Sequence, residues 1–503
     1  MVKLLLIYPE IESSNTNTST YSLPLGLGSI ATYCRQRLED SLEIRILDGS
    51  MMSHAEQLEA TRQFNPDVMG INPTIASQRN AYEIAELAKK LGSKVIFGGV
   101  HSSATWDNGK RGMWKNMLQN REFIDGVVLY DGEIPMHLIL KKLIGNDSLE
   151  ETHNLAYRDS EGRIHEPSSI YIPELSELPN VDYSLFGLPK FFEQTQKRGF
   201  GRAITYYAGK GCEKRGRIKL HMFYSIEEYN QLVSSMDVCT FCGRSDLGLR
   251  NFDEDREAEI VRNLHEKHGV TGFFNVQDTV NLRNSSPIGL NDCWFRLFIG
   301  TESITPENIR KLKQRYGQNL IFQAGVEAAN PQMRQVYGKK AIDSRELIAK
   351  VELMRSEGIQ LHASFILGGM GETREMMHQT TEAARMLADY GNVTWILISP
   401  QLILPGSPDY KALLTRPRMH KKYAEQDLID IVEINQDFLS QFTPDLKRED
   451  IVEEIKRTFD DIKKKNKHVV LDVKGVVGKE EEYVNPSRPY CELLDFNFFL
   501  PRL

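Results

Sequence analysis

The sequence predicts an α/β protein with an N-terminal doubly wound parallel sheet, a partial (β/α)6 TIM-type barrel and a C-terminal helical cap. Short apolar runs alternate with helical runs in two series, one before residue 145 and one after residue 195. Such alternation is typical of parallel sheets covered by helices. After residue 411 the sequence becomes charged and helical. The expected divisions are a domain over 1–145, a linker over 146–195, the barrel over 196–410 and the cap over 411–503.

Composition restricts the class of protein. Of the 503 residues, 41% are hydrophobic and 26% are charged, which is ordinary for a globular protein with two or three domains. A net charge of −7 argues against a mainly electrostatic nucleic-acid binder. No apolar run approaches the ~20 residues that span a bilayer. The six scattered cysteines form no disulfide framework, and we therefore expect a reducing, cytoplasmic environment. Cys34 and Cys293 are expected to be buried thiols.

The N-terminal series contains five expected strands. They cover residues 3–8, 42–47, 67–72, 94–97 and 126–129. Helices are expected over 25–37, 77–91 and 133–143, and the second of them places its apolar residues on one face before Gly92. Doubly wound sheets bind ligands outside the carboxyl ends of their strands. We therefore expect a ligand site where the polar and glycine-rich segments follow these strands.

The second series contains six expected strands. They cover residues 203–207, 272–276, 296–300, 320–326, 360–367 and 393–399. Helices are expected over 253–268, 306–316, 343–357 and 374–390, and only the gap between the second and third strands lacks one. Barrels of this type build their sites at the carboxyl ends of the strands.

Three cysteines lie in the segment Gly209–Gly243, which follows the first barrel strand. Cys239 and Cys242 form a C-x-x-C pair, and 26 residues lie between Cys212 and Cys239. Soft thiolates select zinc or iron–sulfur clusters. The barrel pattern favours iron–sulfur, and the alternative is a structural zinc site that includes His221. A long loop between the cysteines is tolerable, because each doubling of loop length costs only about 0.6 kcal/mol.

Glycine-rich runs end the later barrel strands. GVEAA begins at Gly325, FILGGMGET begins at Phe365, and LPGSP begins at Leu404. Glycines allow close approach of a ligand to the backbone, and a helix N-terminus favours anions. Glu372 in the second run is expected to cap the following helix. The third run is expected to be structural.

The N-terminal half contains three short motifs in this order: LPLGLG from Leu23, GGVHSSA from Gly98 and YDGE from Tyr130. Together with the cysteines and the barrel runs, they resemble the radical S-adenosylmethionine (radical SAM) enzymes that carry a cobalamin-binding domain. The resemblance covers about residues 1–410. The D-x-H-x-x-G signature of mutase-type cobalamin proteins is absent, because no His follows Asp48 at the required place. The chain is in this respect similar to the class B methylases, which implies a cobalt without a protein His ligand.

The resemblance implies residues for each cofactor. The metal ligands of a 4Fe-4S cluster would be Cys212, Cys239 and Cys242, in a loop where the family normally has three residues between the first two cysteines. The residues that would bind SAM are Phe241, Gln277, Asp278, Glu327, Gly368 and Gly369. The residues that would bind cobalamin are Glu10, Leu25, Asp48, Asn72, Thr74, Ser77, Gly98, Gly99, His101, Tyr130, Gly132 and Glu133.

Four of the predicted SAM-binding residues also have an alternative interpretation. Phe241 would pack near the adenine or simply fill the core. Glu327 would accept hydrogen bonds from the ribose diol or be a solvated surface carboxylate. Gln277 and Asp278 would face the methionyl amine or form an ordinary turn. No residue is identified as a catalytic acid or base.

The resemblance implies a C-methyltransferase. A reduced cluster would cleave SAM to a 5′-deoxyadenosyl radical, the radical would take hydrogen from an unactivated carbon, and methylcobalamin would deliver the methyl group. The expected partners are a small-molecule or natural-product substrate and an electron donor such as flavodoxin or ferredoxin, with no nucleic acid and no membrane span. One alternative keeps the fold but catalyses rearrangement, cyclisation or carbon–carbon coupling. Another is a non-catalytic zinc- or cobalamin-binding protein.

Overall fold

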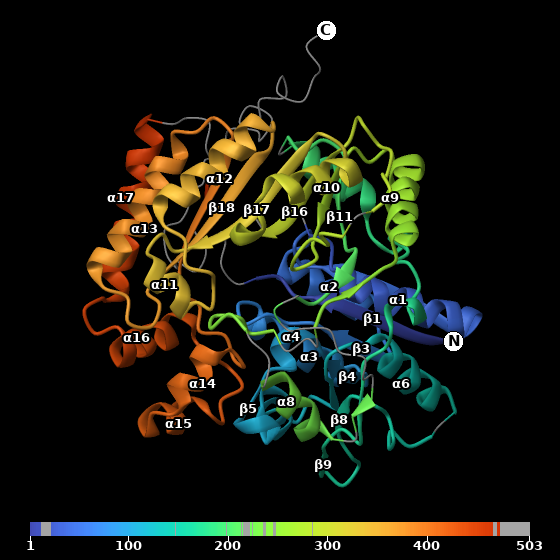
Figure 1. Cartoon of the computed structure of the whole chain (residues 1–503). Helices are drawn as coiled ribbons and strands as arrows, with labels where there is room; N and C mark the ends of the chain where they lie inside the picture. The colour runs from blue at the N-terminus through green and yellow to red at the C-terminus, as the bar shows by residue number, and fades with distance from the viewer. Residues whose placement is uncertain are drawn as a thin grey trace.

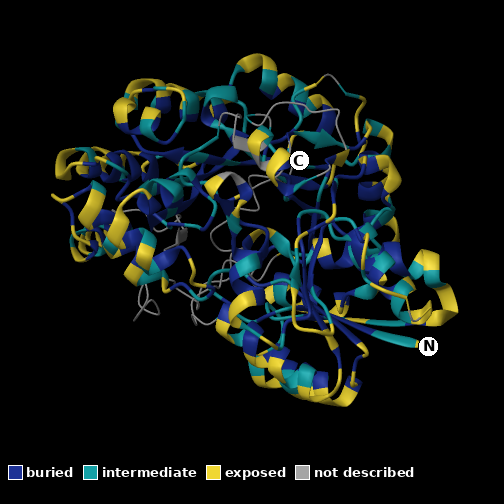
Figure 2. Ribbon diagram, turned by 90° about the horizontal axis from the view of Figure 1, so that it is seen from below, coloured by how far each residue is buried: buried dark blue, intermediate teal, exposed yellow. Residues whose placement is uncertain are grey.

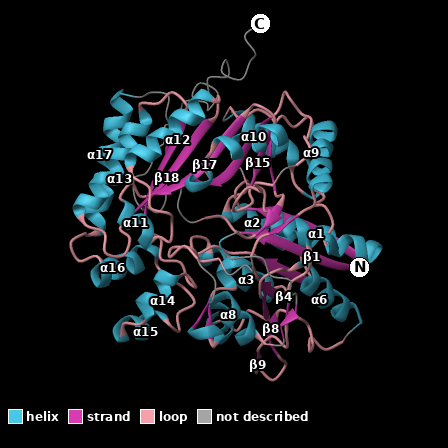
Figure 3. Ribbon diagram, in the orientation of Figure 1, coloured by secondary structure: helices cyan, strands magenta, loops and turns pink. Residues whose placement is uncertain are grey.

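Two seven-stranded sheets form the frame of the protein. The computed structural model describes residues 1–11, 22–145, 147–197, 199–212, 214, 222–223, 225–234, 238–244, 248–283, 285–465 and 470–472. The N-terminal sheet lies below the C-terminal sheet in Figure 1, and helices surround both sheets (Figure 3).

The N-terminal sheet has the strand order β2-β1-β3-β4-β7-β8-β9. Its first five strands are parallel, and they are β1 (Val2–Tyr8), β2 (Leu42–Asp48), β3 (Val68–Ile71), β4 (Lys94–Phe97) and β7 (Gly126–Val128). This arrangement confirms the predicted doubly wound sheet. The strand order reverses between β1 and β3, and such a switch point is where open α/β sheets bind ligands.

Helices cover both faces of this sheet. One face carries α1 (Leu25–Leu38) and α6 (Glu133–Gly145). The other carries α2 (His54–Phe64), α3 (Gln78–Lys90) and α5 (Met113–Asn120). Because both faces are buried, the central strands are apolar at consecutive positions rather than at alternate ones.

A hairpin extends the N-terminal sheet into the segment that was expected to be a linker. Strands β8 (Leu155–Arg158) and β9 (Ile164–His165) add to the free edge of β7 in antiparallel pairing. The pairing satisfies backbone groups that β7 would otherwise expose. The sheet therefore continues beyond residue 145.

The second sheet has the order β11-β15-β16-β17-β18-β19-β20, with every pair parallel. Its first six strands match the prediction, and they are β11 (Ala203–Tyr206), β15 (Gly272–Asn275), β16 (Trp294–Gly300), β17 (Leu320–Glu327), β18 (Gln360–Leu367) and β19 (Val393–Pro400). The helices between them are α9 (Glu254–His268), α10 (Pro306–Tyr316), α11 (Pro331–Val336), α12 (Ser344–Ser356) and α13 (Arg374–Ala388). Strands and inner helix faces are mostly buried, and exposed positions lie on the outer helices (Figure 2).

The C-terminal segment packs against the barrel sheet. Helix α17 (Arg448–Lys465) contacts α13 and β19, and β20 (Val470–Asp472) then pairs with β19. Ile451, Ile455 and Phe459 are at most 1% exposed, and their helical spacing forms an apolar stripe that the sheet covers. Residues 448–472 therefore add a seventh helix–strand unit to the barrel sheet, and the cap over the barrel mouth stays a prediction.

The preceding helices pack on the N-terminal half, and Leu439 of the third helix also joins the barrel core. They are α14 (Pro408–Leu414), α15 (Pro417–Tyr423) and α16 (Ile431–Phe442), and their apolar residues share a core with α3 and α5. The Trp106 ring, for example, lies 5.2 Å from the ring of Tyr410. None of the helices in the described part of the chain is long and apolar enough to cross a membrane.

A polar contact fastens the loop between α15 and α16 to the N-terminal half. Asp427 is 5% exposed, and its carboxylate accepts a hydrogen bond from Arg121 Nε at 2.6 Å. The Asp427 carbonyl accepts bonds from the Tyr82 hydroxyl and the Gln78 amide. Buried polar groups need such partners, since an unpaired one costs free energy.

We expect Asp427→Ala to lower the free energy of unfolding by about 1–3 kcal/mol, because it leaves the half-buried Arg121 guanidinium without this carboxylate. Urea unfolding measures the change. The exposed Glu425→Ala serves as the matched control, with an expected change below about 0.5 kcal/mol. Equal effects of the two substitutions would contradict the stabilising role of Asp427.

Candidate functional site

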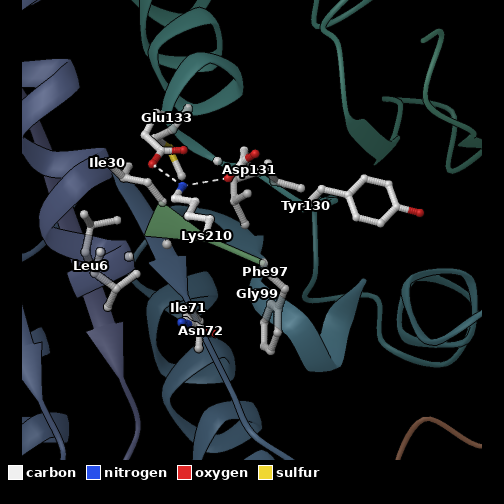
Figure 4. Close-up of a pocket in the computed structure, with 18 residues that line it drawn as sticks. Leu6, Ile30, Ile71, Asn72, Phe97, Gly99, Tyr130, Asp131, Glu133 and Lys210 are labelled. Carbon is white, nitrogen blue, oxygen red and sulfur yellow. Dashed lines mark hydrogen bonds and ion pairs between the residues drawn. The ribbon is translucent and has the colours of Figure 1, made fainter. Parts of the chain in front are cut away.

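A pocket that is open to solvent lies at the switch point of the N-terminal sheet. Figure 4 shows it between the carboxyl ends of β1, β3, β4 and β7 and helices α1 and α6. Its lining is mainly apolar, with polar groups on one side. The lining residues are Leu6, Gly26, Leu27, Ile30, Gly70, Ile71, Asn72, Ile96, Phe97, Gly98, Gly99, Val128, Tyr130, Asp131, Gly132, Glu133, Met136 and Lys210.

Glycines shape this pocket. Gly99 has a φ of +87°, and a Cβ there would lie 1.9 Å from Asn72 Oδ1. A Cβ on Gly70, in β3, would lie 2.6 Å from a methyl group of Leu6. Both positions therefore exclude larger residues, because the Asn72 and Leu6 side chains occupy the space that a Cβ would need.

The polar side of the pocket is an ionic cluster. Lys210 enters from the barrel side, and its Nζ lies 2.6 Å from Asp131 Oδ1 and 3.0 Å from Glu133 Oε1 (Figure 4). Arg250 also pairs with Asp131 at 2.8 Å, and Ser29 donates to Glu133 at 2.7 Å. Burial opposes the charged forms, but the neighbouring charges outweigh it. They hold the pKa of Asp131 well below its usual range and raise the pKa of Lys210.

Half of the predicted cobalamin-binding residues line the pocket. They are Asn72, Gly98, Gly99, Tyr130, Gly132 and Glu133. The structure places the other six outside its lining, and they are Glu10, Leu25, Asp48, Thr74, Ser77 and His101. A role for any of the twelve in binding cobalamin stays a prediction.

Several of the other six have local structural roles. Glu10 accepts a hydrogen bond from the first backbone N–H of α2, at His54, over 2.6 Å. Thr74 N donates to Ser77 Oγ at 2.9 Å within one turn. Burial raises the pKa of Asp48 and lowers the pKa of His101 to about 4. The His101 imidazole is therefore neutral at pH 7.

Sequence reasoning missed Lys210 and Asp131. Asp131 lies inside the YDGE run, and Lys210 lies two residues before Cys212, so both stood next to recognised motifs. Nothing in the sequence showed that the barrel side supplies a residue to the N-terminal pocket. The apolar lining from α1 and α6 was also missed, because an amphipathic pattern does not reveal which helix flanks a ligand.

A short pair of antiparallel strands brackets the cysteine segment. Strands β12 (Gly209–Lys210) and β14 (Arg250–Asn251) are antiparallel partners. Just after β12, Cys212 Sγ lies 3.6 Å from Thr279 Oγ1 in the loop after β15. Cys242 N donates to Cys239 O at 3.0 Å, which closes the C-x-x-C turn.

Part of the insertion between Cys212 and Cys239 crosses to the N-terminal half. Strand β13 (Met222–Phe223) pairs with β10 (Ile170–Tyr171), and α8 (Ile226–Ser234) follows it. The α8 residue Tyr229 is fully buried, and its ring lies 4.1 Å from that of Tyr130. This segment therefore belongs to the N-terminal core, whereas the cysteines on either side of it lie on the barrel.

The C-x-x-C turn returns to the carboxyl edge of the barrel sheet. Asp409 N donates to Thr240 O at 3.0 Å, and Arg244 pairs with Asp278 at 3.0 Å. A Cβ on Gly338 would lie 3.5 Å from Cys239 Cα. These contacts bring the turn to the loops that follow three different strands.

The donor chemistry of this edge fits an iron–sulfur cluster, since three half-buried cysteines that form no disulfide lie there. Within the described ranges, however, no three His, Cys, Asp or Glu side chains already form a group that could hold a metal ion. The alternative zinc ligand His221, and residues 213 and 215–220, lie outside those ranges. The cysteines therefore remain predicted ligands.

The predicted SAM-binding residues lie around the same edge. Glu327 is 7% exposed, pairs with Lys339 at 3.3 Å and has a φ of +62° next to a β-bulge. It is therefore not a solvated surface carboxylate. Phe241 packs edge-to-face on Tyr337, with ring centroids 5.7 Å apart. Gln277 is buried and donates to Asn251 of β14.

The glycine run after β18 is built differently from the expectation. The Glu372 carboxylate accepts hydrogen bonds from the N–H groups of Gly368 and Gly369. Helix α13 is capped instead by Thr373, whose hydroxyl accepts from Met376 N at 3.2 Å. The predicted helix-capping role of Glu372 is thus wrong: its side chain turns back over the preceding loop. Burial raises the pKa of Glu372 to about 7.

The inner face of the barrel sheet carries a polar row that sequence reasoning missed. Gln323 is the register partner of Phe298 on one side and of His362 on the other. Arg296 lies on the same face and covers the Phe274 ring at 4.2 Å. Burial lowers the pKa of His362 well below its ordinary value, and Arg296 adds to this effect. The row offers neutral and cationic donors inside the barrel.

With the pocket and the cysteines described, comparison with solved structures shows that the chain has the fold of the cobalamin-dependent radical SAM enzymes. A radical SAM methyltransferase from Kitasatospora setae, solved with tryptophan and a SAM analogue, superposes with a TM-score of 0.58 over 81% of this chain and 75% of that chain, at 14% identity. The cobalamin-dependent radical SAM enzyme OxsB, solved with aqua-cobalamin and SAM, gives 0.57 over 88% and 60%, at 14% identity. These likenesses confirm the fold that the sequence motifs indicated.

Two curated sequences are also similar. An uncharacterized methyltransferase of Pyrococcus horikoshii is 25% identical and covers 78% of this chain and 80% of its own length. The cytidylyl-2-hydroxyethylphosphonate methyltransferase of Streptomyces wedmorensis is 22% identical and covers 79% of each chain. No protein-family model matches the sequence.

The buried Glu372 predicts a pH dependence of stability. Its folded-state pKa of about 7 exceeds its ordinary value, so the folded state binds this proton more tightly than the unfolded state. Stability should therefore fall by about 2 kcal/mol as pH rises from 4.5 to 7. In Glu372→Gln this fall should disappear, whereas the exposed Glu375→Gln should retain it. Urea unfolding at several pH values gives the slopes, and an unchanged slope in Glu372→Gln would contradict the assignment.

Thiol reactivity should separate the cysteines of the metal-free protein. Cys212 and Cys242 are partly exposed, whereas Cys34 and Cys293 are buried. Burial raises the pKa of Cys34 far above its usual value and that of Cys293 to about 12. A thiol reagent at pH 8 should modify the first pair at least about tenfold faster, because only the thiolate reacts. Peptide mass mapping measures the rates, and similar rates for the two pairs would disprove the burial pattern.

Proposed function

We propose that this protein is a cobalamin-dependent radical SAM enzyme that methylates an unactivated carbon of a small-molecule or natural-product substrate. The observation that carries the proposal is the position of Lys210. This residue leads directly to Cys212 at the barrel edge, and its ammonium lines the pocket of the N-terminal sheet. The methyltransferase names of the two curated relatives support the same reaction.

The residues present fit the two cofactors. The switch-point pocket is apolar and glycine-lined, and it would hold an arm of cobalamin rather than the whole molecule. Cys212, Cys239 and Cys242 would hold a 4Fe-4S cluster. When bound, the cluster supplies the electron that cleaves SAM to a 5′-deoxyadenosyl radical, and methylcobalamin supplies the methyl group.

The protein's own groups would position SAM and the substrate. Glu327 is held at the end of β17 by Lys339, where its carboxylate would accept hydrogen bonds from a ribose diol. Glu372 fixes the two N–H groups of the glycine run that would lie near the adenosyl group. Arg296 and Gln323 line the inner face of the barrel and would orient the substrate.

The proposal includes partners and a location. An electron donor such as flavodoxin or ferredoxin would reduce the cluster. The chain would work in the cytoplasm, because a reducing compartment keeps the three cysteines of the site from forming disulfides.

Anaerobic reconstitution with iron and sulfide, followed by electron paramagnetic resonance (EPR) of the reduced protein, tests the proposal. We expect a 4Fe-4S signal that changes when SAM is added, and absorbance changes when cobalamin is added. Cys212→Ala should lose or alter the cluster signal, whereas Cys293→Ala, a cysteine outside the predicted site, should retain it. Wild-type protein that retains zinc and forms no cluster would refute the enzymatic proposal.

A further inference from the structure

The proposed function gives no role to the long segment between Cys212 and Cys239. Three of its described residues are buried in the core of the N-terminal half: Phe223 and Ile226 are each 2% exposed, and Tyr229 is fully buried. The rings of Phe223 and Tyr229 meet edge-to-face, with centroids 5.3 Å apart. The described part of this segment is therefore packed against the N-terminal half.

The hairpin at the base of the segment is held by the same half. Lys210 and Arg250 are register partners in β12 and β14. Both reach Asp131, at 2.6 and 2.8 Å, and Lys210 also reaches Glu133. All four side chains are largely buried, with exposed fractions of 22% for Lys210, 11% for Arg250, 9% for Asp131 and 2% for Glu133. Opposite charges at such distances in a weakly screened site attract strongly.

Both attachments reach one short segment, Tyr130–Glu133. Lys210 contacts its acidic residues, and the Tyr229 ring packs at a tilt against the Tyr130 ring, with centroids 4.1 Å apart. This segment also lines the pocket. In Figure 4 the Tyr130 ring points away from the pocket, so that its backbone forms the pocket wall while its ring is free to meet α8.

The backbone of Tyr130 is strained. Its φ is +65°, a conformation that costs a non-glycine residue on the order of 1–2 kcal/mol. Such a conformation persists only where the surroundings enforce it. Ser103 helps by accepting a hydrogen bond from Tyr130 N at 2.9 Å. The contact of the Tyr229 ring with Tyr130 and the ion pairs of Lys210 supply further restraints from the cysteine segment.

We propose that Lys210 and Tyr229 are positioning residues that couple the pocket to the metal site, so that cobalamin and the cluster each favour the binding of the other. The proposal rests on the function proposed above. Ligation of Cys212 and Cys239 would restrain both ends of the segment that carries Tyr229. The segment Tyr130–Glu133, which forms one wall of the pocket, would then already be ordered when cobalamin binds. Because the entropy cost of ordering this wall would be met by cluster binding, cobalamin would bind more tightly to the protein that holds the cluster. Thermodynamic linkage makes the effect reciprocal.

Cobalamin titrations followed by absorbance test the coupling. Each variant is titrated with hydroxocobalamin before and after cluster reconstitution, and the ratio of the two dissociation constants is compared. In the wild type we expect cobalamin to bind about 5- to 50-fold tighter when the cluster is present. Lys210→Met and Tyr229→Leu should reduce this ratio to about one, because each removes one attachment and keeps apolar bulk. Lys210→Arg and Tyr229→Phe should preserve most of it.

The control is a buried lysine ion pair elsewhere. Lys313 is 16% exposed and pairs with Glu357 at 2.7 Å on the outside of the barrel, so Lys313→Met should leave the ratio unchanged. A wild-type ratio of one, or an undiminished ratio in both Lys210→Met and Tyr229→Leu, would overturn the coupling while leaving the proposed function intact. Wild-type protein that binds no cluster or no cobalamin would overturn both proposals.

Discussion

The ionic cluster between Lys210, Arg250, Asp131 and Glu133 joins the two halves of the protein between the pocket and the cysteine segment. Two cations come from the hairpin beside the cysteine segment, and two anions come from the end of β7 and the start of α6. Removing one charge from such a cluster leaves the others uncompensated in a buried site, which costs more than the pair contributes. The cluster therefore fixes the relation between two sites that belong to different sheets.

Each site follows from a general property of parallel sheets. In the N-terminal half, strand order reverses beside β1, and the crevice between the diverging loops becomes the pocket. In the barrel, all strands point the same way, so their carboxyl ends gather the cysteine turn, Glu327 and the glycine run at one edge. The candidate site residues therefore lie on loops, and the parallel strands bring these loops to one edge of each sheet.

Much of the fold could be predicted from sequence, because buried strands are continuous apolar runs and helices show a clear period. The eleven expected strands, five in the N-terminal half and six in the barrel, are all present. It was harder to predict which helices and strands pack against one another. The short apolar run at Val470–Asp472 follows a highly charged helix, and nothing local indicated that it pairs with β19. Amphipathic helices such as α16 revealed an apolar face but not the distant helices that cover it.

The site was predictable where a motif is local and not where two segments meet. The C-x-x-C pair and the glycine run were recognised because their residues are adjacent in sequence. Lys210 lies 77 residues from its partner Glu133, and that separation carries no pattern. Glu372 shows a related limit. Its position before α13 suggested a cap, but Thr373 is one residue closer to the helix and leaves the Glu372 carboxylate to the loop.

The sharing of one core by α3, α5 and the helices α14–α16 has a consequence for how the chain folds during synthesis. The N-terminal sheet can pair its strands once residue 128 has emerged, but the helices α14–α16, which share a core with α3 and α5, come only from residues 408–442. Until then the nascent chain displays apolar helix surface while the whole barrel is being made. Such exposed surface is prone to association. We therefore expect these helices to dock late, after the barrel strands up to β19 have been made.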